Sequence, residues 1–164
     1  MSSRRVLGDE SATLALAARL AVAARAGDVL GLSGPLGAGK TTFARAFIAA
    51  RAVMAGVEPE DVPSPTFTLV QAYDFPGDPV ETPSVHHIDL YRTENPDEAI
   101  ELGLDDAFAT GISLVEWPER LGAHMPRDRI EVRLAPGATA GERVVELVGF
   151  GTGRKRLKEA GLDG

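Results

Sequence analysis

Residues Gly34–Thr41 read GPLGAGKT and match the pattern G-x-x-x-x-G-K-[ST] at every fixed position. An apolar run, Val29–Leu32, precedes this stretch, and a helical pattern follows it from Thr42. Strand, glycine loop and helix in this order can cradle phosphate, because glycines let backbone N–H groups turn inward and the next helix adds its positive end. The stretch therefore predicts a loop that holds nucleotide phosphates between a strand and a helix.

Two side chains of this loop carry chemistry that its backbone cannot supply. The ammonium of Lys40 is expected to reach the β- and γ-phosphates, and the hydroxyl of Thr41 is expected to bind a magnesium ion. The sequence thus predicts ATP and Mg²⁺ as the ligands of this loop.

The bulk composition limits the class of protein further. At 164 residues the chain has the length of one domain. Its 17 basic against 24 acidic residues argue against a sequence-independent grip on nucleic acid, so DNA is not an expected partner. The absence of cysteine excludes disulfides and zinc–thiolate sites. The apolar stretch Leu14–Ala24 contains Arg19 and is too short to span a bilayer, so we expect a soluble, cytoplasmic protein without membrane contact.

Periodicity along the rest of the chain predicts alternating strands and helices. Helical patterns run from Asp9 or Ser11 to about Arg25, from about Lys40 to Met54, and from the N-cap Asn95 to about Gly103. Apolar or β-branched runs predict strands at Val29–Ser33, Thr66–Tyr73, Val85–Leu90 and Ile112–Glu116. Alternating apolar and polar residues predict an antiparallel hairpin formed by Arg129–Ala135 and Arg143–Val148.

This order of elements predicts an α/β fold, in the form of a three-layer P-loop NTPase. Its central sheet would be mixed and mainly parallel, with helices on both faces and an antiparallel C-terminal hairpin. The P-loop ATPase domain would cover residues 1–150, and residues 151–164 would form a basic C-terminal tail. We expect this tail to be a frayed, solvated surface helix rather than a contact with RNA.

Hydrolysis or transfer of a phosphate also needs an acid near the metal and a group that places the nucleophile. Two carboxylates, Asp89 and Glu116, come at the ends of short apolar strands. One would lie in the magnesium shell and the other would position water. The strand that ends at Glu116 is the more apolar of the two, so it should be more central and bring Glu116 closer to the metal.

Three further features admit more than one interpretation. Ser64–Thr66 is a polar, proline-stiffened loop that could contact a γ-phosphate, as switch loops do, or could simply turn into a strand. Trp117 could cover the site or pack in the core. His86 and His87 could suggest a metal pair, but neighbours on a strand face opposite ways, so we expect one buried and one exposed histidine.

Five segments of the chain occur in the order and at the spacing of one protein family. They are Gly34–Thr42 (GPLGAGKTT), Ser64–Val70 (SPTFTLV), His87–Arg92 (HIDLYR), Glu101–Gly103 (ELG) and Leu114–Pro118 (LVEWP). In these segments the chain resembles TsaE (formerly YjeE), the small ATPase of bacterial tRNA threonylcarbamoyladenosine synthesis. The resemblance covers about residues 9–148 and leaves out the C-terminal tail.

The resemblance implies a role for each matching residue of the site. The ATP phosphates would be bound by Gly37, Ala38, Gly39, Lys40, Thr41 and Thr42. Thr41 and Glu116 would coordinate magnesium, and Asp89 would be a carboxylate needed for hydrolysis, either by orienting water or by supporting the metal. Lys40, Asp89 and Glu116 would together form the catalytic set.

Other segments would complete the site in a protein of this family. Ser64 and Thr66 would lie in a switch-like loop. Asp9, ahead of the first helix, would lie near the nucleoside, and so would the Gly141–Arg143 turn.

The resemblance also implies partners. The family's ATPase is weak alone and works with a TsaB–TsaD heterodimer, whose TsaD subunit transfers the threonylcarbamoyl group to adenosine next to the tRNA anticodon. By resemblance, this chain would hydrolyse ATP with magnesium and thereby reset that complex. It would meet tRNA only indirectly, through the complex.

Two other functions fit parts of the sequence. Small-molecule P-loop kinases share a similar loop and size, and Asp89–Arg92 offers an acid and an arginine at kinase-like spacing. Against a kinase, Arg120, Arg127 and Arg129 are scattered rather than gathered in an arginine-rich lid. The second alternative is a nucleotide-dependent binding switch with negligible turnover of its own.

Overall fold

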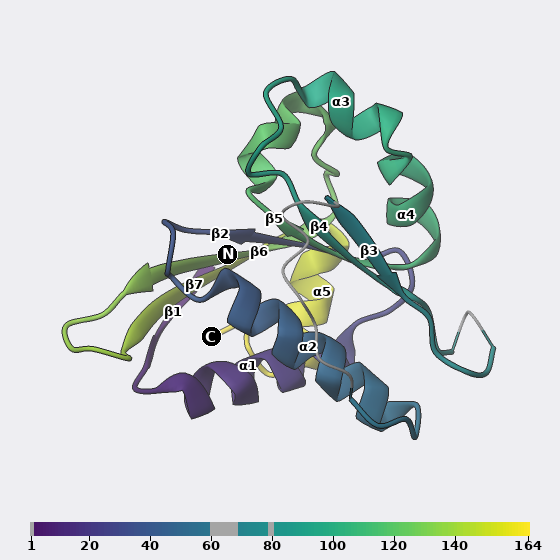
Figure 1. The fold of residues 1–164 in the computed structure, drawn as a ribbon. Coiled ribbons are helices and arrows are strands. Elements are labelled where there is room, and N and C mark those ends of the chain that lie inside the picture. Colours follow the sequence, from purple (N-terminus) through teal and green to yellow (C-terminus); the bar gives the residue numbers. More distant parts are fainter. Residues whose placement is uncertain (1, 60–68, 79–80) are drawn as a thin grey trace.

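A seven-stranded mixed sheet forms the centre of the fold, in a computed structural model that describes residues 2–59, 69–78 and 81–164 (Figure 1). The strands are β1 (Ser2–Leu7), β2 (Val29–Ser33), β3 (Val70–Tyr73), β4 (Val85–Asp89), β5 (Ile112–Glu116), β6 (Arg129–Pro136) and β7 (Arg143–Phe150). They lie in the order β1-β7-β6-β2-β5-β4-β3. The inner strands β6, β2, β5 and β4 are parallel, and β7, β1 and β3 join antiparallel at the edges. The predicted mixed sheet with an antiparallel C-terminal hairpin is confirmed.

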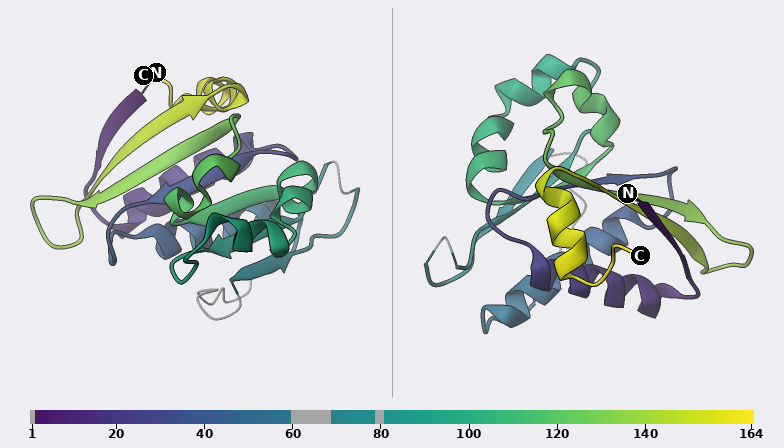
Figure 2. Two further views of the ribbon diagram at one scale, coloured as in Figure 1. Left: turned by 90° about the horizontal axis from the view of Figure 1, so that it is seen from above. Right: turned by 180° about the vertical axis from the view of Figure 1, so that it is seen from behind.

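Helices cover both faces of the sheet (Figure 1, Figure 2). One face carries α1 (Glu10–Ala23), α2 (Lys40–Met54) and α5 (Thr152–Glu159), and the other carries α3 (Pro96–Glu101), α4 (Leu104–Thr110) and the 3₁₀-helix η1 (Pro118–His124). Local signals set two of the helix starts. Asp9 accepts a hydrogen bond of 2.9 Å from the backbone N–H of Ala12, and Asn95 caps α3 through the N–H of Asp97. The helices predicted from these caps are confirmed.

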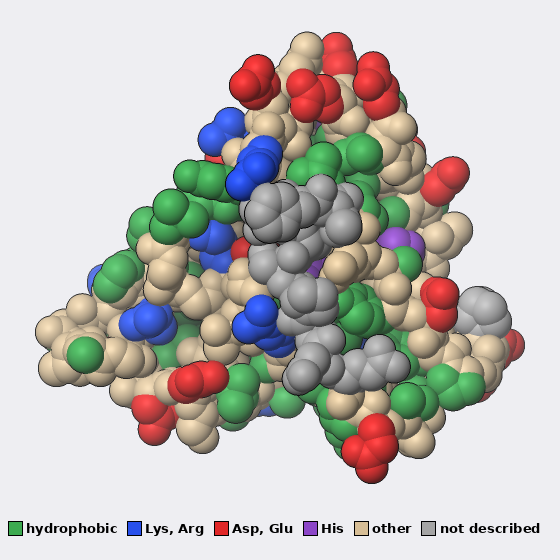
Figure 3. Space-filling model, viewed as in Figure 1, with side chains coloured by type: hydrophobic (Ala, Val, Ile, Leu, Met, Phe, Trp, Pro, Cys, Tyr) green, Lys and Arg blue, Asp and Glu red, His purple; other side chains and the backbone are tan. Residues whose placement is uncertain are grey.

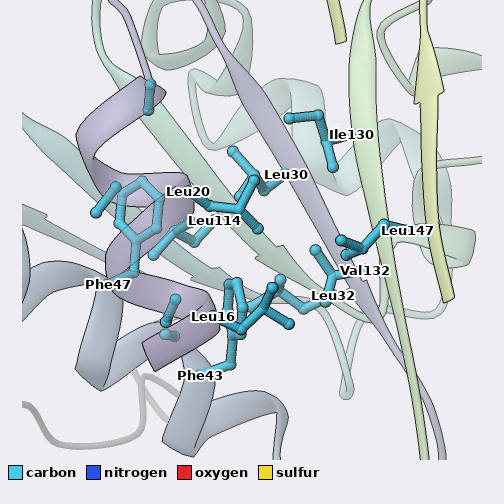
Figure 4. Packing of buried hydrophobic residues seen from close by; sticks show 14 of the residues in the cluster. Leu16, Leu20, Leu30, Leu32, Phe43, Phe47, Leu114, Ile130, Val132 and Leu147 are labelled. Carbon is cyan, nitrogen blue, oxygen red and sulfur yellow. The ribbon is translucent and has the colours of Figure 1, made fainter. Parts of the chain in front are cut away.

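The larger core lies between the sheet and the helices α1 and α2 (Figure 4). Alternate residues of β2 face it, so Leu30 and Leu32 are buried there, whereas Val29 belongs to the core on the opposite face. Phe43 and Phe47 of α2 enter the larger core with 0 % exposure. Each buried ring stabilises the fold by about 2 kcal/mol. This packing holds α2, which follows the glycine loop, against β2, which precedes it.

Strand β1 is a part of the fold that the sequence pattern did not predict. It pairs antiparallel with β7, with Leu7 opposite Arg143. Its sequence alternates only weakly, since Ser3 and Leu7 are its two buried residues. The strand therefore depends on hydrogen bonds from β7, a segment far away in the chain, and carries little local signal of its own.

The predicted strand Thr66–Tyr73 is only partly covered by the structure. Its described portion is the strand Val70–Tyr73, preceded by Leu69 with a positive φ of 64°. Ser64 and Thr66, the residues expected in a switch-like loop, lie outside the described residues.

The predicted C-terminal helix is present as α5, but it packs against the domain through one side instead of being frayed. Leu157 and Leu162 are 2 % and 0 % exposed and belong to the larger core. Arg156 forms an ion pair of 2.8 Å with the buried Asp28, and the hydroxyl of Ser3 donates to the carbonyl of Leu162. The helix α5 lies on the same side of the sheet as α1, and the two chain ends lie close together (Figure 2).

Within the described ranges, no helix combines the length and the apolarity needed to cross a membrane.

Candidate nucleotide-binding site

The glycine loop leaves the carboxyl end of β2 and leads into α2, as the sequence pattern predicts. Gly34 and Gly39 have positive φ values of 142° and 103°, which favour glycine. A Cβ atom on Gly34 would lie 2.2 Å from the carbonyl oxygen of Leu134, so no other residue fits there. The N-cap residue of α2, Gly39, has no side chain that could cap the helix, so the described structure leaves its first backbone N–H groups available for an anion.

Lys40, the first residue of α2, folds back over the loop. Its Nζ donates to the carbonyl oxygens of Gly34 at 2.5 Å and Pro35 at 3.0 Å. The same ammonium lies 4.2 Å from the ring centroid of Trp117, in a cation–π contact. Burial lowers the pKa of Lys40, and the negative charge of Glu116 opposes this by favouring the ammonium. The lysine is thus held as a buried cation beside the loop.

Thr41 and Glu116 meet directly, although they lie on different elements. The Thr41 hydroxyl is 3.0 Å from Oε1 and 3.2 Å from Oε2 of Glu116. Glu116 ends β5, which lies between β2 and β4, and its backbone is opposite Leu32 in the register of β2. The sequence prediction that the Glu116 strand is central is confirmed.

Asp89 lies beside Glu116 at the same edge of the sheet. It ends β4 and is paired with Glu116 in the parallel register of β4 and β5. Asp89 is 5 % exposed, and its Oδ1 accepts a hydrogen bond of 3.0 Å from the backbone N–H of Tyr91. The two strand-end carboxylates that the sequence singled out are therefore neighbours.

A cleft of about 370 Å³ brings these groups together. Its lining residues are Leu36, Gly37, Gly39, Lys40, Thr41, Thr42, Asp89, Tyr91, Glu116, Trp117 and Arg143. This volume falls in the range of small-molecule sites. In the view of Figure 3, acidic side chains gather over α3 and α4, whereas lysine and arginine side chains lie nearer the middle of the molecule. The lining residues of the cleft thus bring together the backbone of the glycine loop, the cations Lys40 and Arg143, and the carboxylates Asp89 and Glu116. They meet at one end of the parallel strands.

Asp9 takes a different place from the other predicted residues. It is exposed, caps α1, and is not among the described residues that line the cleft. It follows β1 closely, however, and the last residue of β1, Leu7, pairs with Arg143 of β7. Arg143 in turn donates to the carbonyl oxygen of Gly37 at 3.2 Å, so the start of α1 lies on the side of the sheet that carries the glycine loop.

Trp117 both covers Lys40 and packs, so its two interpretations are not exclusive. It has a positive φ of 61°, directly after β5. Its ring contacts the Lys40 ammonium on the cleft side and the ring of Tyr91 at a centroid distance of 5.0 Å. Tyr91 is a cleft residue that the sequence reasoning did not single out.

His87 lies behind the cleft, and its contact with Glu116 was not predicted from the sequence. His87 is 0 % exposed, and its Nε2 lies 2.6 Å from Oε2 of Glu116. The neighbouring His86 is half-buried, and burial lowers its pKa. His87 is buried as expected, but the expectation that the other histidine would be exposed is wrong, because His86 is half-buried. The alternation of side chains along a strand could have indicated this position, because His87 and Asp89 are two residues apart and share a face of β4.

The oxygen groups of the cleft fit a hard divalent cation. A hydroxyl and a carboxylate within 3.0 Å of each other are ligands of the kind that Mg²⁺ takes together with substrate phosphates. Across the described part of the chain, no group of three or more His, Cys, Asp or Glu residues could hold a metal by itself. A cation in this cleft would therefore depend on Thr41, one or two carboxylates and the phosphates of a nucleotide.

The model of one protein family, described as "Threonylcarbamoyl adenosine biosynthesis protein TsaE", matches residues 7–145. The chain belongs to the TsaE family. TsaE of Rickettsia bellii is 35 % identical over 134 residues, covering 82 % of this chain and 87 % of the relative. TsaE of Bacillus subtilis is 39 % identical over 121 residues, covering 73 % and 69 %. The crystal structure of Bacillus subtilis YdiB is similar with a TM-score of 0.77 and 28 % identity, over 98 % of this chain and 95 % of that one.

Membership of the TsaE family associates the chain with tRNA threonylcarbamoyladenosine biosynthesis, and thus with tRNA modification. Nucleotide binding at the glycine loop is consistent with that family.

Proposed function

We propose that this protein is a magnesium-dependent ATP hydrolase that supports threonylcarbamoylation of the adenosine next to the tRNA anticodon. It would act with a heterodimer resembling TsaB and TsaD, and its ATP hydrolysis would reset that complex between rounds. The observation that carries this proposal is the contact between Thr41 and Glu116 beside the glycine loop, since it joins a metal-binding hydroxyl to a strand-end carboxylate.

The residues of the cleft would divide the work. The backbone of Gly37–Thr42 and the Lys40 ammonium would hold the phosphates, and Thr41 with Glu116 would hold Mg²⁺. Bound Mg²⁺ would supply positive charge that stabilises the transferring phosphoryl group. Asp89 would either orient the attacking water or support the metal from the neighbouring strand.

The resting position of Lys40 supports weak activity of the protein alone. Its ammonium is already hydrogen-bonded to Gly34 and Pro35 and covered by Trp117. Phosphate binding would have to replace these contacts, and a partner that favours the rearranged loop would raise the rate. The net charge of −7 supports contact with tRNA through the partners rather than directly.

The experiment that tests this function measures phosphate release from labelled ATP with Mg²⁺ or with EDTA, for the natural protein and for Glu116→Ala. We expect slow, magnesium-dependent release from the natural protein. In Glu116→Ala that release should be lost, while part of the nucleotide affinity remains. A metabolite extract is added in a parallel reaction, because a labelled organic phosphate there would identify a small-molecule kinase and overturn the proposal.

A further inference from the structure

His87 lies beneath the floor of the cleft and contacts Glu116 from the buried side. Because β4 and β5 pair with Asp89 opposite Glu116, His87 is one strand repeat deeper on the face that carries both carboxylates. Its ring is fully buried, and it is not among the described residues that line the cleft. It therefore contacts the carboxylate without reaching the space that a ligand would occupy.

The chemistry of this contact assigns the proton. An ionised carboxylate can only accept hydrogen bonds, so Nε2 of His87 carries the hydrogen and donates it to Oε2 of Glu116 at 2.6 Å. In the part of the chain that the structure describes, the buried Nδ1 has no hydrogen-bond partner. Among the described residues, no hydrogen bond on the far side of the ring therefore accounts for a histidine here.

Within the described part of the chain, the other side-chain donor to Glu116 is the hydroxyl of Thr41. Glu116 is 3 % exposed, and the single proton of the Thr41 hydroxyl is shared between its two oxygens. Among the described residues, His87 gives the other hydrogen bond to this carboxylate. It engages Oε2, while Oε1 faces Thr41 at the shorter distance of 3.0 Å.

We propose that His87 is a positioning residue for Glu116, whose Nε2–H holds Oε2 so that Oε1 and the Thr41 hydroxyl are presented together to a divalent cation. The inference rests on the proposed function, because it needs a cation at Thr41 and Glu116. Hydrogen bonds behind a metal ligand fix its orientation, and their loss typically weakens metal binding by about 10- to 100-fold.

The test compares four variants of the full chain. His87→Leu keeps an apolar volume and removes the donor, and His87→Asn carries an amide that ends short of Glu116. In His87→Gln the amide N–H lies about as far from the backbone as Nε2 of histidine, so it should restore the hydrogen bond to Glu116. His86→Gln is the matched control, because His86 is on the opposite face of β4. Mn²⁺ binding to the ADP-loaded protein is measured by electron paramagnetic resonance, and ADP binding is measured separately in EDTA.

We expect His87→Leu and His87→Asn to weaken Mn²⁺ binding by about 10- to 100-fold, with ADP affinity in EDTA unchanged within about twofold. His87→Gln and the His86→Gln control should bind Mn²⁺ nearly as the natural protein does. If His87→Leu does not fold, His87→Asn and His87→Gln still form a pair with and without the donor.

Two results would overturn the inference while leaving the proposed function intact. One is normal Mn²⁺ binding by the folded Leu and Asn variants, and the other is an equal loss in His87→Gln, which would make the ring's shape the deciding property. A natural protein that binds ADP but no Mn²⁺ would overturn the inference and the magnesium-dependent function together.

Discussion

The hydroxyl of Thr41 lies 3.0 Å from Oε1 of Glu116, although 75 positions separate the two residues in the chain. The contact joins the first turn of α2 to the end of β5, the strand next to the one that feeds the glycine loop. It thereby links the element that would hold phosphate to the element that supplies a carboxylate. The arrangement needs no larger group of protein ligands for a magnesium ion, since nucleotide phosphates complete the coordination of the ion in such sites.

Lys40→Ala should reduce ATP affinity by about 10- to 100-fold, because a hydrogen bond to a charged group is lost. The fold should survive, since the contacts of the ammonium with described residues are to backbone carbonyls of its own loop and to the face of Trp117. Isothermal titration with ATP measures the change. Lys155→Ala, on the exposed side of α5, is the control and should bind as the natural protein does. Equal affinity in both variants would refute a phosphate-binding role for Lys40.

Asp89→Asn should leave ATP bound and slow its hydrolysis by about 100-fold or more, because the amide cannot accept a proton or assist the metal as a carboxylate does. The substitution is nearly isosteric, and the amide oxygen can still accept the hydrogen bond from the Tyr91 N–H. Rapid-quench measurement of phosphate release, together with a nucleotide titration, separates the two effects. Unchanged turnover would reduce Asp89 to a structural acid.

Local sequence signals predicted the parts of the site that depend on near neighbours. The glycine loop and the helix Lys40–Met54 are set by the motif and its flanking periodicity. The meeting of Asp89 with Glu116 also followed from sequence, since both residues end parallel strands and carboxyl ends share one edge. The roles of these residues toward ATP and Mg²⁺ stay predictions.

The parts that could not be predicted depend on pairing between distant segments. Strand β1 is recognisable only through its pairing with β7, and the contact of His87 with Glu116 requires the register of β4 against β5. The packing of the C-terminal segment carries little sequence signal, because its two buried leucines, Leu157 in α5 and Leu162 after it, stand among many charged residues. Such sparse patterns resemble those of solvated helices.

Leu157→Ala should lower the free energy of unfolding by about 2 to 5 kcal/mol, because it leaves a cavity between α5 and the core. Urea denaturation followed by circular dichroism measures the change. The control is Val22→Ala on α1, where the side chain is 62 % exposed and the expected change is within about 0.5 kcal/mol. A change in Leu157→Ala as small as in the control would mean that α5 contributes little to stability.

Glu131→Gln should destabilise the protein at neutral pH by about 1 kcal/mol. Burial opposes ionisation of Glu131, but hydrogen bonds from Arg129 and Arg133 outweigh it and lower the pKa of its carboxyl. A lowered folded-state pKa stabilises the protein above the unfolded value, and that contribution is lost as pH falls through the folded value. Unfolding at several pH values should therefore show the variant and the natural protein converging below about pH 4. A constant difference across pH would contradict this ion-pair account.

The function proposed for the cleft formed by Lys40, Thr41, Asp89 and Glu116 is ATP hydrolysis in the service of tRNA modification. The most direct test measures phosphate release by this protein with Mg²⁺ and tRNA, in the absence and presence of a TsaB–TsaD-like heterodimer. We expect a slow rate for the protein alone and a rate in the mixture well above the sum of the separate rates, with the excess abolished by Lys40→Ala. Equal rates with and without the heterodimer, or an excess that persists in Lys40→Ala, would contradict it.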